Sequence, residues 1–439
     1  MLYILVFIRL ARFHKLIFTF WVQFGYSGDS YVWYLFGMER VIIHVDLNSC
    51  FATCEQQDNP QWRGKPLGVV QDSGKRSVII ASSIEAKVLG ISTAHLIYEA
   101  KKICPNIILV PANFERYVKY AKKFRKVCFN YSDRVEVFSI DELFLDVTKT
   151  KHLFGGAGKI ALELKRRLKE EVGDYLRCSV GIAPNKMLAK LASGLKKPDG
   201  LVRVDPDKRL EFLDKHELWH ICGIGHRIEK RLKRMGIYSI KSMRRVPREY
   251  LKREFGALGE TYWHWAHGED FSEVAFFDQI DPDKSYGNQV TLSADLVGEK
   301  KIMKVLLWLC WQVASRLREK KVAARVVRLA LRYGDKWSWA QKTSDPCTTA
   351  YDLYRVAKFI YKNKVKWDMP VRFVGVSSGN LIPLSSTPLP LIEEQVKQQK
   401  FSKAWDKISQ KYGTFYLRPA SLLRKGLKET TLNGFSKKF

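Results

Sequence analysis

Two adjacent carboxylates lie between two apolar runs in the stretch Phe138-Ser139-Ile140-Asp141-Glu142-Leu143-Phe144-Leu145-Asp146. The pattern predicts strands over residues 134–138 and 143–147, with Asp141 and Glu142 in the turn between them. Neighbouring acids at the end of a sheet repel one another, and a bound divalent cation relieves that cost. Taken alone, an Asp-Glu pair in a hairpin is more often a solvated turn, so the surrounding residues decide its meaning.

A second strand pattern also ends on a carboxylate. The β-branched run Val41-Ile42-Ile43-His44-Val45-Asp46 is typical of a buried strand, and Asp46 would supply a third acid to the same site. Three carboxylates with open positions suit Mg²⁺ ions that also bind substrate phosphates. Two such ions clamp the attacking and leaving oxygens of a phosphoryl transfer.

Length and charge limit the class of protein. With 439 residues the chain exceeds the roughly 250–300 at which single cores stop growing, so several domains are expected. A hydrophobic content of 46% excludes a disordered scaffold. Lys and Arg number 75 against 45 Asp and Glu, a net charge of +30. Such an excess indicates a polyanionic partner, with nucleic acid first and an anionic membrane surface second.

The cysteines and the N-terminus suggest a reduced, cytoplasmic protein. The eight cysteines form no CxxC pair, which indicates thiols in cores rather than a disulfide or zinc framework. Residues 1–37 contain two apolar runs, interrupted by Arg9, Arg12 and Lys15, and neither reaches the ~20 residues of a membrane span. We interpret them as an extension ahead of a domain that begins at Met38; a signal anchor and a wrongly chosen start codon are the alternatives.

Strand and helix patterns alternate along the rest of the chain, as in α/β or α+β sheets. Strands are expected over 67–70, 77–81 and 178–182, a turn at 72–74, and helices over 85–89, 97–103, 114–131 and 159–172. From about residue 204 charged helices surround Gly223 and Gly225. After an Asp-rich linker at 278–284, a two-layer module is expected, with strands 289–293, 325–333 and 371–377 and helices 299–320 and 349–363.

Four ordered motifs resemble those of the Y-family (DinB/UmuC-like) translesion DNA polymerases, over roughly residues 38–384. They are VDLNSCFATCE (45–55), FSIDE (138–142), VGIAPNKMLAKLAS (180–193) and KKPDG (196–200). The resemblance implies an α+β multidomain right-hand polymerase with a ferredoxin-like palm, small fingers, a helical helix-hairpin-helix thumb and an α/β little finger. The implied boundaries are extension 1–37, palm 38–49 and 113–203, fingers 50–112, thumb 204–275, linker 276–284, little finger 285–384 and basic tail 385–439.

The same resemblance assigns roles at the active site. The carboxylates of Asp46, Asp141 and Glu142, with the backbone carbonyl of Leu47, are implied to hold two Mg²⁺ ions, for which Mn²⁺ substitutes. Phe51 matches the steric gate that excludes a ribose 2′-hydroxyl; without the surrounding motif it would be interpreted as a core phenylalanine. Lys197 matches a lysine that reaches the triphosphate, and a solvated loop charge is its alternative. Neutralising phosphate charge is the main help a protein gives this reaction.

One stretch departs from the family pattern. Most DinB-type members carry an Asn-Tyr-x-Ala-Arg run that grips the β and γ phosphates, whereas this chain has SSIEAK (82–87). Lys87 replaces the arginine as a point charge, but Ile84 offers no hydroxyl group. UmuC-type members look similar at this place, so the subfamily stays open.

The C-terminal half carries the DNA-binding features. The run Leu218-Trp219-His220-Ile221-Cys222-Gly223-Ile224-Gly225 and the helix after it resemble a helix-hairpin-helix, in which glycines and helix-start amides approach a phosphate. Residues 226–248 carry nine basic groups and one acid, a net +8. The DNA-binding residues expected there are Gly223, Gly225, Arg227, Lys230 and Arg231. The module 285–384 has 18 basic and 7 acidic residues, a net +11, and matches the little finger.

The basic tail, with a net charge of +7, begins near a peptide that resembles a clamp-binding motif. Pro388-Leu389-Pro390-Leu391-Ile392 is similar to the segment with which bacterial polymerases bind the sliding clamp, although proline and isoleucine replace the usual glutamine and phenylalanine. Leu389, Leu391 and Ile392 would be its anchors. An ordered linker is the equally weighted alternative.

Taken together, these features predict a template-directed DNA polymerase for low-fidelity translesion synthesis in DNA repair, acting on primer-template DNA and dNTPs, cytoplasmic and without a membrane partner. A non-catalytic DNA-binding relative that recruits partners is the alternative, and the intact Asp46, Asp141 and Glu142 argue against it. A nucleotidyl cyclase would share the sheet and metal pair but leaves the hairpin and the basic half unexplained.

Overall fold

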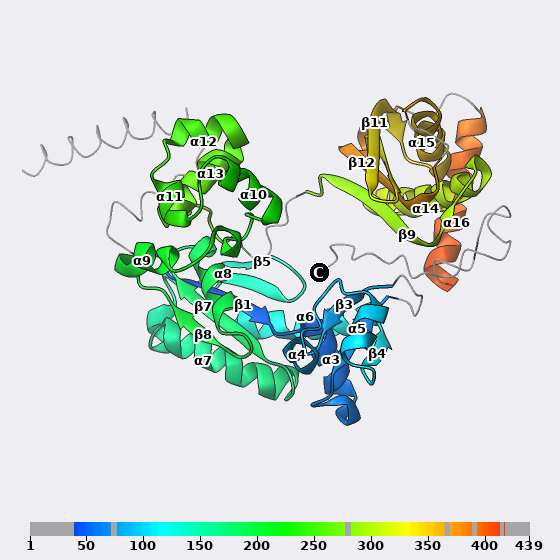
Figure 1. Ribbon diagram of the computed structural model, residues 1–439. Helices are drawn as coiled ribbons and strands as arrows, with labels where there is room; N and C mark the ends of the chain where they lie inside the picture. Colours follow the sequence, from blue (N-terminus) through cyan, green and yellow to red (C-terminus); the bar gives the residue numbers. More distant parts are fainter. Residues whose placement is uncertain are drawn as a thin grey trace, which may run out of the picture.

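The computed structural model describes residues 39–71, 77–276, 282–364, 369–388 and 393–412, together with Leu417. The described residues form three β-sheets and a group of short helices (Figure 1), and the three-stranded sheet is inserted between β1 and the other strands of the five-stranded sheet. The α+β multidomain fold class expected from the sequence is confirmed. The N-terminal extension, the turn at 72–74 and the side chains of Leu389, Leu391 and Ile392 lie outside the described residues. No helix in the described ranges has the length and apolar character needed to cross a bilayer.

The first sheet has five strands in the order β5-β6-β1-β7-β8. Neighbours are antiparallel except β7 and β8, which are parallel. The strands are β1 (Ile42–Leu47), β5 (Val135–Val137), β6 (Glu142–Asp146), β7 (Cys178–Ala183) and β8 (Leu201–Arg203). The sequence patterns located the first four within two residues, while the short edge strand β8 was not expected.

Both faces of this sheet are buried, each in its own core. Side chains that alternate along β1 explain the division, because Ile43 and Val45 enter one core and Ile42 the other. The first core includes α6 (Phe114–Cys128) and α7 (Ala157–Arg167), which a π-helical turn, Leu168–Val172, extends. The second includes α8 (Lys186–Leu195), whose N-cap Asn185 accepts a hydrogen bond from the amide of Leu188 at 3.0 Å.

A three-stranded sheet with three short helices follows β1 in sequence. Its order is β3-β2-β4, antiparallel between β3 and β2 and parallel between β2 and β4. The strands are β2 (Leu67–Val70), β3 (Ile79–Ser82) and β4 (Ile108–Pro111), and the helices are α3 (Cys50–Asp58), α4 (Ile84–Val88) and α5 (Ile97–Ile103). The strand β4 was not expected, since it is only four residues long and ends in proline.

Five helices follow β8: α9 (Arg209–Asp214), α10 (His226–Arg234), α11 (Ile240–Arg244), α12 (Arg248–Phe255) and α13 (Ala257–Ala266). Their apolar side chains, among them Leu232, Met243 and Tyr262, join the α8 core. Packing rather than propensity holds such short helices, because isolated helices of this length are marginal in water.

The C-terminal module is a four-stranded antiparallel sheet of order β11-β10-β12-β9 with two helices. Its elements are β9 (Ser285–Leu296), α14 (Glu299–Glu319), β10 (Val322–Tyr333), β11 (Lys336–Cys347), α15 (Ala350–Lys364) and β12 (Val371–Pro383). The sequence analysis missed β11, which carries few β-branched apolar residues and contains Pro346. As an edge strand, β11 tolerates a proline that donates no ladder hydrogen bond.

A further helix, α16 (Glu393–Tyr412), stands in the segment that the sequence described only as a basic tail. It packs on α14, where Trp405 stacks on Trp311 with ring centroids 4.4 Å apart. Arg318 donates two hydrogen bonds to the Asp406 carboxylate, at 2.6 and 2.7 Å. The start of the tail is therefore part of the C-terminal module.

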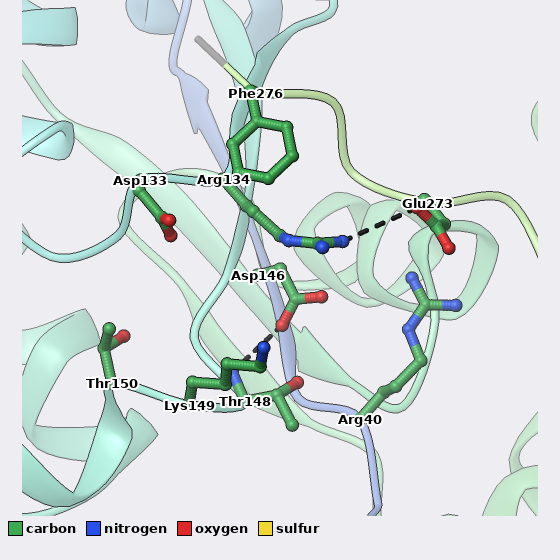
Figure 2. Close-up of a pocket in the computed structure, with 9 residues that line it drawn as sticks. All are labelled: Arg40, Asp133, Arg134, Asp146, Thr148, Lys149, Thr150, Glu273 and Phe276. Carbon is green, nitrogen blue, oxygen red and sulfur yellow. Dashed lines mark hydrogen bonds and ion pairs between the residues drawn. The ribbon is translucent and has the colours of Figure 1, made fainter. Parts of the chain in front are cut away.

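The chain after α13 returns to the five-stranded sheet (Figure 2). Arg134 lies 3.5 Å from the Glu273 carboxylate, and its guanidinium carbon lies 4.8 Å from the centre of the Phe276 ring. Lys186 forms an ion pair with Glu136, whose carboxylate also accepts from the amide of Ala275 at 3.2 Å. These contacts keep the chain against the sheet as far as Phe276.

Candidate active site

Strand register brings the predicted carboxylates to one end of the five-stranded sheet. The α-carbons of Asp46 and Glu142 are directly opposite each other in the β1–β6 pair. Directly opposed residues of an antiparallel pair share a face, so both side chains leave the sheet on the same side. The amide of Leu47 donates to the carbonyl of Asp141 at 2.9 Å, which holds the acidic turn against the end of β1.

Glu142 is held by two basic side chains that the sequence analysis did not select. His44 Nε2 lies 3.1 Å from Glu142 Oε2, and Lys190 on α8 contacts the same carboxylate. Burial alone would raise the pKa of Glu142, but the His44 and Lys190 interactions outweigh it and lower the pKa to about 2. Two features of the sequence could have identified them. Lys190 lies in the motif at residues 180–193, and His44 is a polar residue within an apolar strand pattern.

His44 is completely buried beneath this carboxylate. Its Nδ1 lies 2.7 Å from the hydroxyl of Ser193 on α8, which fixes the ring between helix and sheet. Burial is the largest influence on its pKa and lowers it, although Glu142 acts in the opposite direction. His44 is therefore a positioning residue for Glu142.

Asp141 has a different electrostatic environment. Burial raises the pKa of its carboxyl group, and the nearby Asp46 and Glu142 charges raise it further, although a hydrogen bond from Ser139 opposes them. That hydrogen bond joins Ser139 Oγ to Asp141 Oδ1 at 2.6 Å. Negative charge thus accumulates around Asp141, as a cation site requires.

The side chains of the acids are nevertheless turned toward lysines. Lys197 Nζ lies 2.8 Å from Asp46 Oδ1, while Glu142 contacts Lys190. Across the described ranges, no three or more His, Cys, Asp or Glu side chains are grouped so that they could hold a metal ion. The backbone brings the carboxylates together, and the lysines compensate their charge.

Two lysines from different elements flank the carboxylates. Lys197 follows α8, and Lys87 lies on α4, which begins where the Ser83 hydroxyl accepts from the amide of Ala86 at 3.2 Å. Desolvation of the Lys87 ammonium group and the charge of Lys197 lower the pKa of Lys87, whereas Asp46 and Asp141 raise it. Both cations therefore lie close enough to the acids for their charges to interact.

Phe51 lies on α3, just after β1, and is half-buried. Its ring stacks on Tyr117 of α6, with centroids 4.4 Å apart and planes 7° apart. The Tyr117 hydroxyl donates to Glu55 Oε1 at 2.8 Å and accepts from the amide of Asn113 at 3.1 Å. The aromatic ring behind Phe51 is thus fixed at both its face and its hydroxyl. The sequence analysis did not select Tyr117.

A cavity of about 450 Å³ lies between Asp46 and the helical region after β8. Asp46, Lys190 and Lys197 line one side, and Trp219, His220 and Cys222 line the other. The predicted hairpin thus begins at the cavity that borders Asp46.

The hairpin glycines lie beyond this cavity. Gly223 has a φ of 104°, and a β-carbon there would approach the Trp265 ring to 3.1 Å, so a side chain is excluded on both grounds. Gly225 is the N-cap of α10, and Arg227 and Lys230 on that helix are exposed. Arg231 instead donates to the carbonyl of Glu254 at 2.6 Å and lies over the Phe255 ring. It joins α10 to α12.

An end of a sheet that gathers acids, faces lysines and borders a basic helical hairpin has the groups that a template-directed nucleic-acid polymerase needs. Comparison with known proteins agrees with this class. Residues 45–194 match the impB/mucB/samB family, and residues 283–391 match the impB/mucB/samB family C-terminal domain.

Curated relatives match along nearly their whole length. DNA polymerase IV of Pelotomaculum thermopropionicum is 36% identical over 402 residues, which are 88% of this chain and 98% of the relative. DNA polymerase IV 1 of Bacillus subtilis is 31% identical, covering 92% of this chain and 98% of the relative. A solved Y-family DNA polymerase chimera is similar with a TM-score of 0.67 and 25% identity, covering 78% of this chain and 99% of the chimera.

The chain belongs to the impB/mucB/samB family of Y-family DNA polymerases. Its function is that of a translesion DNA polymerase, a DNA-directed DNA polymerase similar to bacterial DNA polymerase IV. Members of this family generally use divalent metal ions.

Proposed function

We propose that this polymerase adds nucleotides by two-metal nucleotidyl transfer, with two Mg²⁺ ions held by Asp46, Asp141, Glu142 and the backbone carbonyl of Leu47, and with Mn²⁺ able to substitute. The observation that carries the proposal is the opposition of Asp46 and Glu142 across β1 and β6, with the acidic turn bonded to Leu47. The donor atoms are all oxygens, which Mg²⁺ prefers. When bound, the ions supply Lewis-acid activation and neutralise developing charge.

The residues fit such a pair of cations electrostatically. The carboxyl of Asp141 is buried among other acids and its pKa is raised, so negative charge there lacks full compensation. His44 and Lys190 hold Glu142 in its charged form, because they lower its pKa against the effect of burial. Asp46 would exchange Lys197 for the ion, and solvent at the partly exposed lysine weakens the pair that must separate.

Lys197 and Lys87 are proposed to bind the dNTP triphosphate. Both ammonium groups lie beside the carboxylates, where phosphates that share the metal ions would sit. Phe51 is proposed as the steric gate: its ring follows the first metal ligand by five residues, and Tyr117 supports it from behind. A ring braced in this way excludes a 2′-hydroxyl by contact.

Primer-template DNA is proposed to bind along the thumb, residues 204–275, and the little finger, residues 285–384. Gly223 and Gly225 let the backbone approach a phosphate, and the exposed Arg227 and Lys230 add charge. The main role proposed for Arg231 is to hold α10 against α12 through Glu254, and its contact with DNA is secondary. The palm would comprise 38–49 and 113–203, the fingers 50–112 and the linker 276–284.

Two further roles rest on the sequence. Sliding-clamp binding through Leu389, Leu391 and Ile392 is proposed from the peptide pattern alone, since these residues lie outside the described ones. A cytoplasmic location is proposed from the reduced cysteine pattern.

Primer extension with the full chain tests the metal site. Asp141→Asn and Glu142→Gln should abolish nucleotide addition in Mg²⁺ while primer-template affinity stays within a few fold, because phosphate contacts by distant basic residues dominate binding. Asp146→Asn is the matched control: it lies on β6 on the same face, four residues from Glu142, and should retain activity. Wild-type extension rates in the Asp141 and Glu142 variants would refute the assignment.

A further inference from the structure

The helix α4, which carries Lys87, is too short to hold its own direction. It consists of the five residues Ile84–Val88, little more than one turn. Isolated helices of this length are marginal in water, because forming the first turn costs more conformational entropy than its hydrogen bonds return. The direction of α4, and with it the direction of Lys87, therefore depends on contacts that other parts of the chain make with this helix.

Glu85 makes such contacts on the side of α4 that lies away from Lys87. The two residues are two positions apart, which is about 200° around a helix of 3.6 residues per turn, so their side chains leave α4 on opposite sides. Lys87 is exposed, and its charge interacts with those of Asp46 and Asp141. Glu85 instead contacts α3 and the loop at 173–177, which leads into β7.

Both carboxylate oxygens of Glu85 accept hydrogen bonds from outside α4. The side-chain amide of Gln56, on α3, donates to Oε2 at 3.1 Å. The hydroxyl of Tyr175 donates to Oε1 at 2.8 Å and accepts from the backbone amide of Gly64 at 2.9 Å. Desolvation raises the pKa of Glu85, but its hydrogen bonds, the one from Tyr175 included, outweigh that effect and lower the pKa. Glu85 is therefore held as a charged group.

The loop that carries Tyr175 is itself held by residues of α3 and of the segment after it. Arg63 donates to both oxygens of the Asp174 carboxylate, at 2.9 and 3.0 Å, and its guanidinium carbon lies 5.1 Å from the centre of the Tyr175 ring. The backbone amide of Tyr175 donates to Gln57 Oε1 at 2.7 Å, and Gln57 Nε2 donates to Asp174 Oδ1 at 2.8 Å. Several contacts of the loop thus fix where the Tyr175 hydroxyl lies.

The same loop is continuous with the sheet that carries the acids. The amide of Asn48, just after β1, donates to the carbonyl of Arg177 at 2.8 Å. In the β1–β7 pair that follows, Ser179 is directly opposite Asp46. The hydrogen bond from Tyr175 to Glu85 therefore sets the position of α4 relative to the end of the sheet where Asp46 lies.

We propose that Tyr175 is a positioning residue for dNTP binding, which holds α4 through Glu85 so that the Lys87 ammonium group meets the triphosphate. The inference rests on the proposed function in one respect, the role of Lys87. Tyr175 itself does not touch the substrate. Without its hydroxyl, Glu85 would keep the hydrogen bond from Gln56 but lose the one from the loop, and Lys87 would spend less time directed at the phosphates. The carboxylates are held by other residues, so the effect falls on binding and not on the chemical step.

Single-turnover insertion of one nucleotide by the full chain tests the proposal, because it separates the apparent Kd for dNTP from the maximum rate. Tyr175→Phe keeps the ring and removes the hydroxyl. It should raise the apparent Kd by about threefold to tenfold and change the maximum rate by less than about twofold. Tyr98→Phe is the matched control: the Tyr98 hydroxyl also donates to a glutamate, Glu99, at 3.2 Å, but it lies on α5 and the residue is 51% exposed. Both quantities should keep their wild-type values in this control.

The double variant decides whether Tyr175 acts through Lys87. Lys87→Ala should raise the apparent Kd by about tenfold, because a charge-assisted phosphate contact is lost. Adding Tyr175→Phe to Lys87→Ala should raise it by less than about 1.5-fold more, since two residues that act through one contact do not add. A further rise as large as Tyr175→Phe causes in the wild-type protein would overturn the proposal, because the hydroxyl would then act by another route.

The remaining outcomes separate this inference from the role of Lys87. A raised Kd in Lys87→Ala with an unchanged Kd in Tyr175→Phe would refute the inference alone, whereas an unchanged Kd in Lys87→Ala would refute the phosphate role of Lys87 and the inference together. Primer-template affinity should stay within about twofold of wild type in every variant, because other surfaces hold the DNA. A loss of that affinity in Tyr175→Phe would also overturn the inference, since the hydroxyl would then support more than α4.

Discussion

The ammonium nitrogen of Lys197 lies 2.8 Å from Oδ1 of Asp46. Lys197 is proposed to bind the triphosphate and Asp46 a metal ion. In this structure the charge of each side chain neutralises that of the other. The Lys197 side chain is 42% exposed and that of Asp46 is 18% exposed, so solvent at the lysine screens their attraction. Incoming substrate can separate the two groups at small cost.

Lys197→Ala should raise KM for dNTP by about tenfold, because one charge-assisted phosphate contact is lost. Single-nucleotide insertion kinetics on an undamaged template measure this. Lys196→Ala removes the neighbouring exposed charge and should leave KM unchanged. If KM were the same in all three proteins, Lys197 would be only a solvated partner of Asp46.

Phe51→Ala should admit ribonucleotides, since the gate is proposed to act by contact and its removal abolishes the clash. The ratio of rNTP to dNTP insertion efficiency should rise by about tenfold or more. Tyr117→Phe keeps the stacked ring and loses the hydroxyl that bonds Glu55, so it should raise the ratio less. An unaltered ratio in Phe51→Ala would make Phe51 a core residue only.

Glu142→Gln should change how stability depends on pH. The pKa of Glu142 is lowered from 4.5 to about 2, so its charged form adds stability above about pH 4.5, and this is lost as pH falls toward 2. In the metal-free protein at pH 7 the variant should be less stable by on the order of 1–3 kcal/mol. The difference from wild type should shrink steadily below pH 4.5.

Urea unfolding at several pH values measures that difference. Glu115→Gln on α6, where the residue is exposed, is the control and should follow the wild-type curve throughout. A difference that stayed constant with pH would show that the pKa of Glu142 is not lowered in the folded protein.

Deleting residues 285–439 should weaken primer-template binding and flatten its dependence on salt. Each phosphate contact contributes about −0.9 to the log–log slope on duplex DNA, and the deletion removes the net +11 of residues 285–384. The shortened protein should fold, because the two cores on either face of the five-stranded sheet contain no described side chain beyond Val274. Slow distributive synthesis should persist. Identical slopes for full and shortened chains would place the DNA contact in the thumb.

Local patterns predicted much of the fold. Short apolar runs along 41–46 and 143–147 identified β1 and β6, and helical patterns identified α6, α14 and α15. The missed strand β11 shows the limit of such patterns. Its exposed face carries Trp337, Trp339 and Gln341, and Pro346 stands near its end, so its own residues argue weakly for a strand. These residues form a strand because they pair by hydrogen bonds with the neighbouring strand β10.

The sequence by itself determined the family and singled out the three acids proposed as metal ligands, because each motif that carries them consists of residues close together in the chain. The tertiary structure decided which cation meets which carboxylate. His44, Lys190 and Lys197 reach Glu142 and Asp46 only because β1, β6 and α8 pack together. It also decided that Trp337 and Phe373 form one surface. Side-chain direction follows the local backbone, whereas a neighbour from a distant segment follows register and packing, which no local pattern encodes.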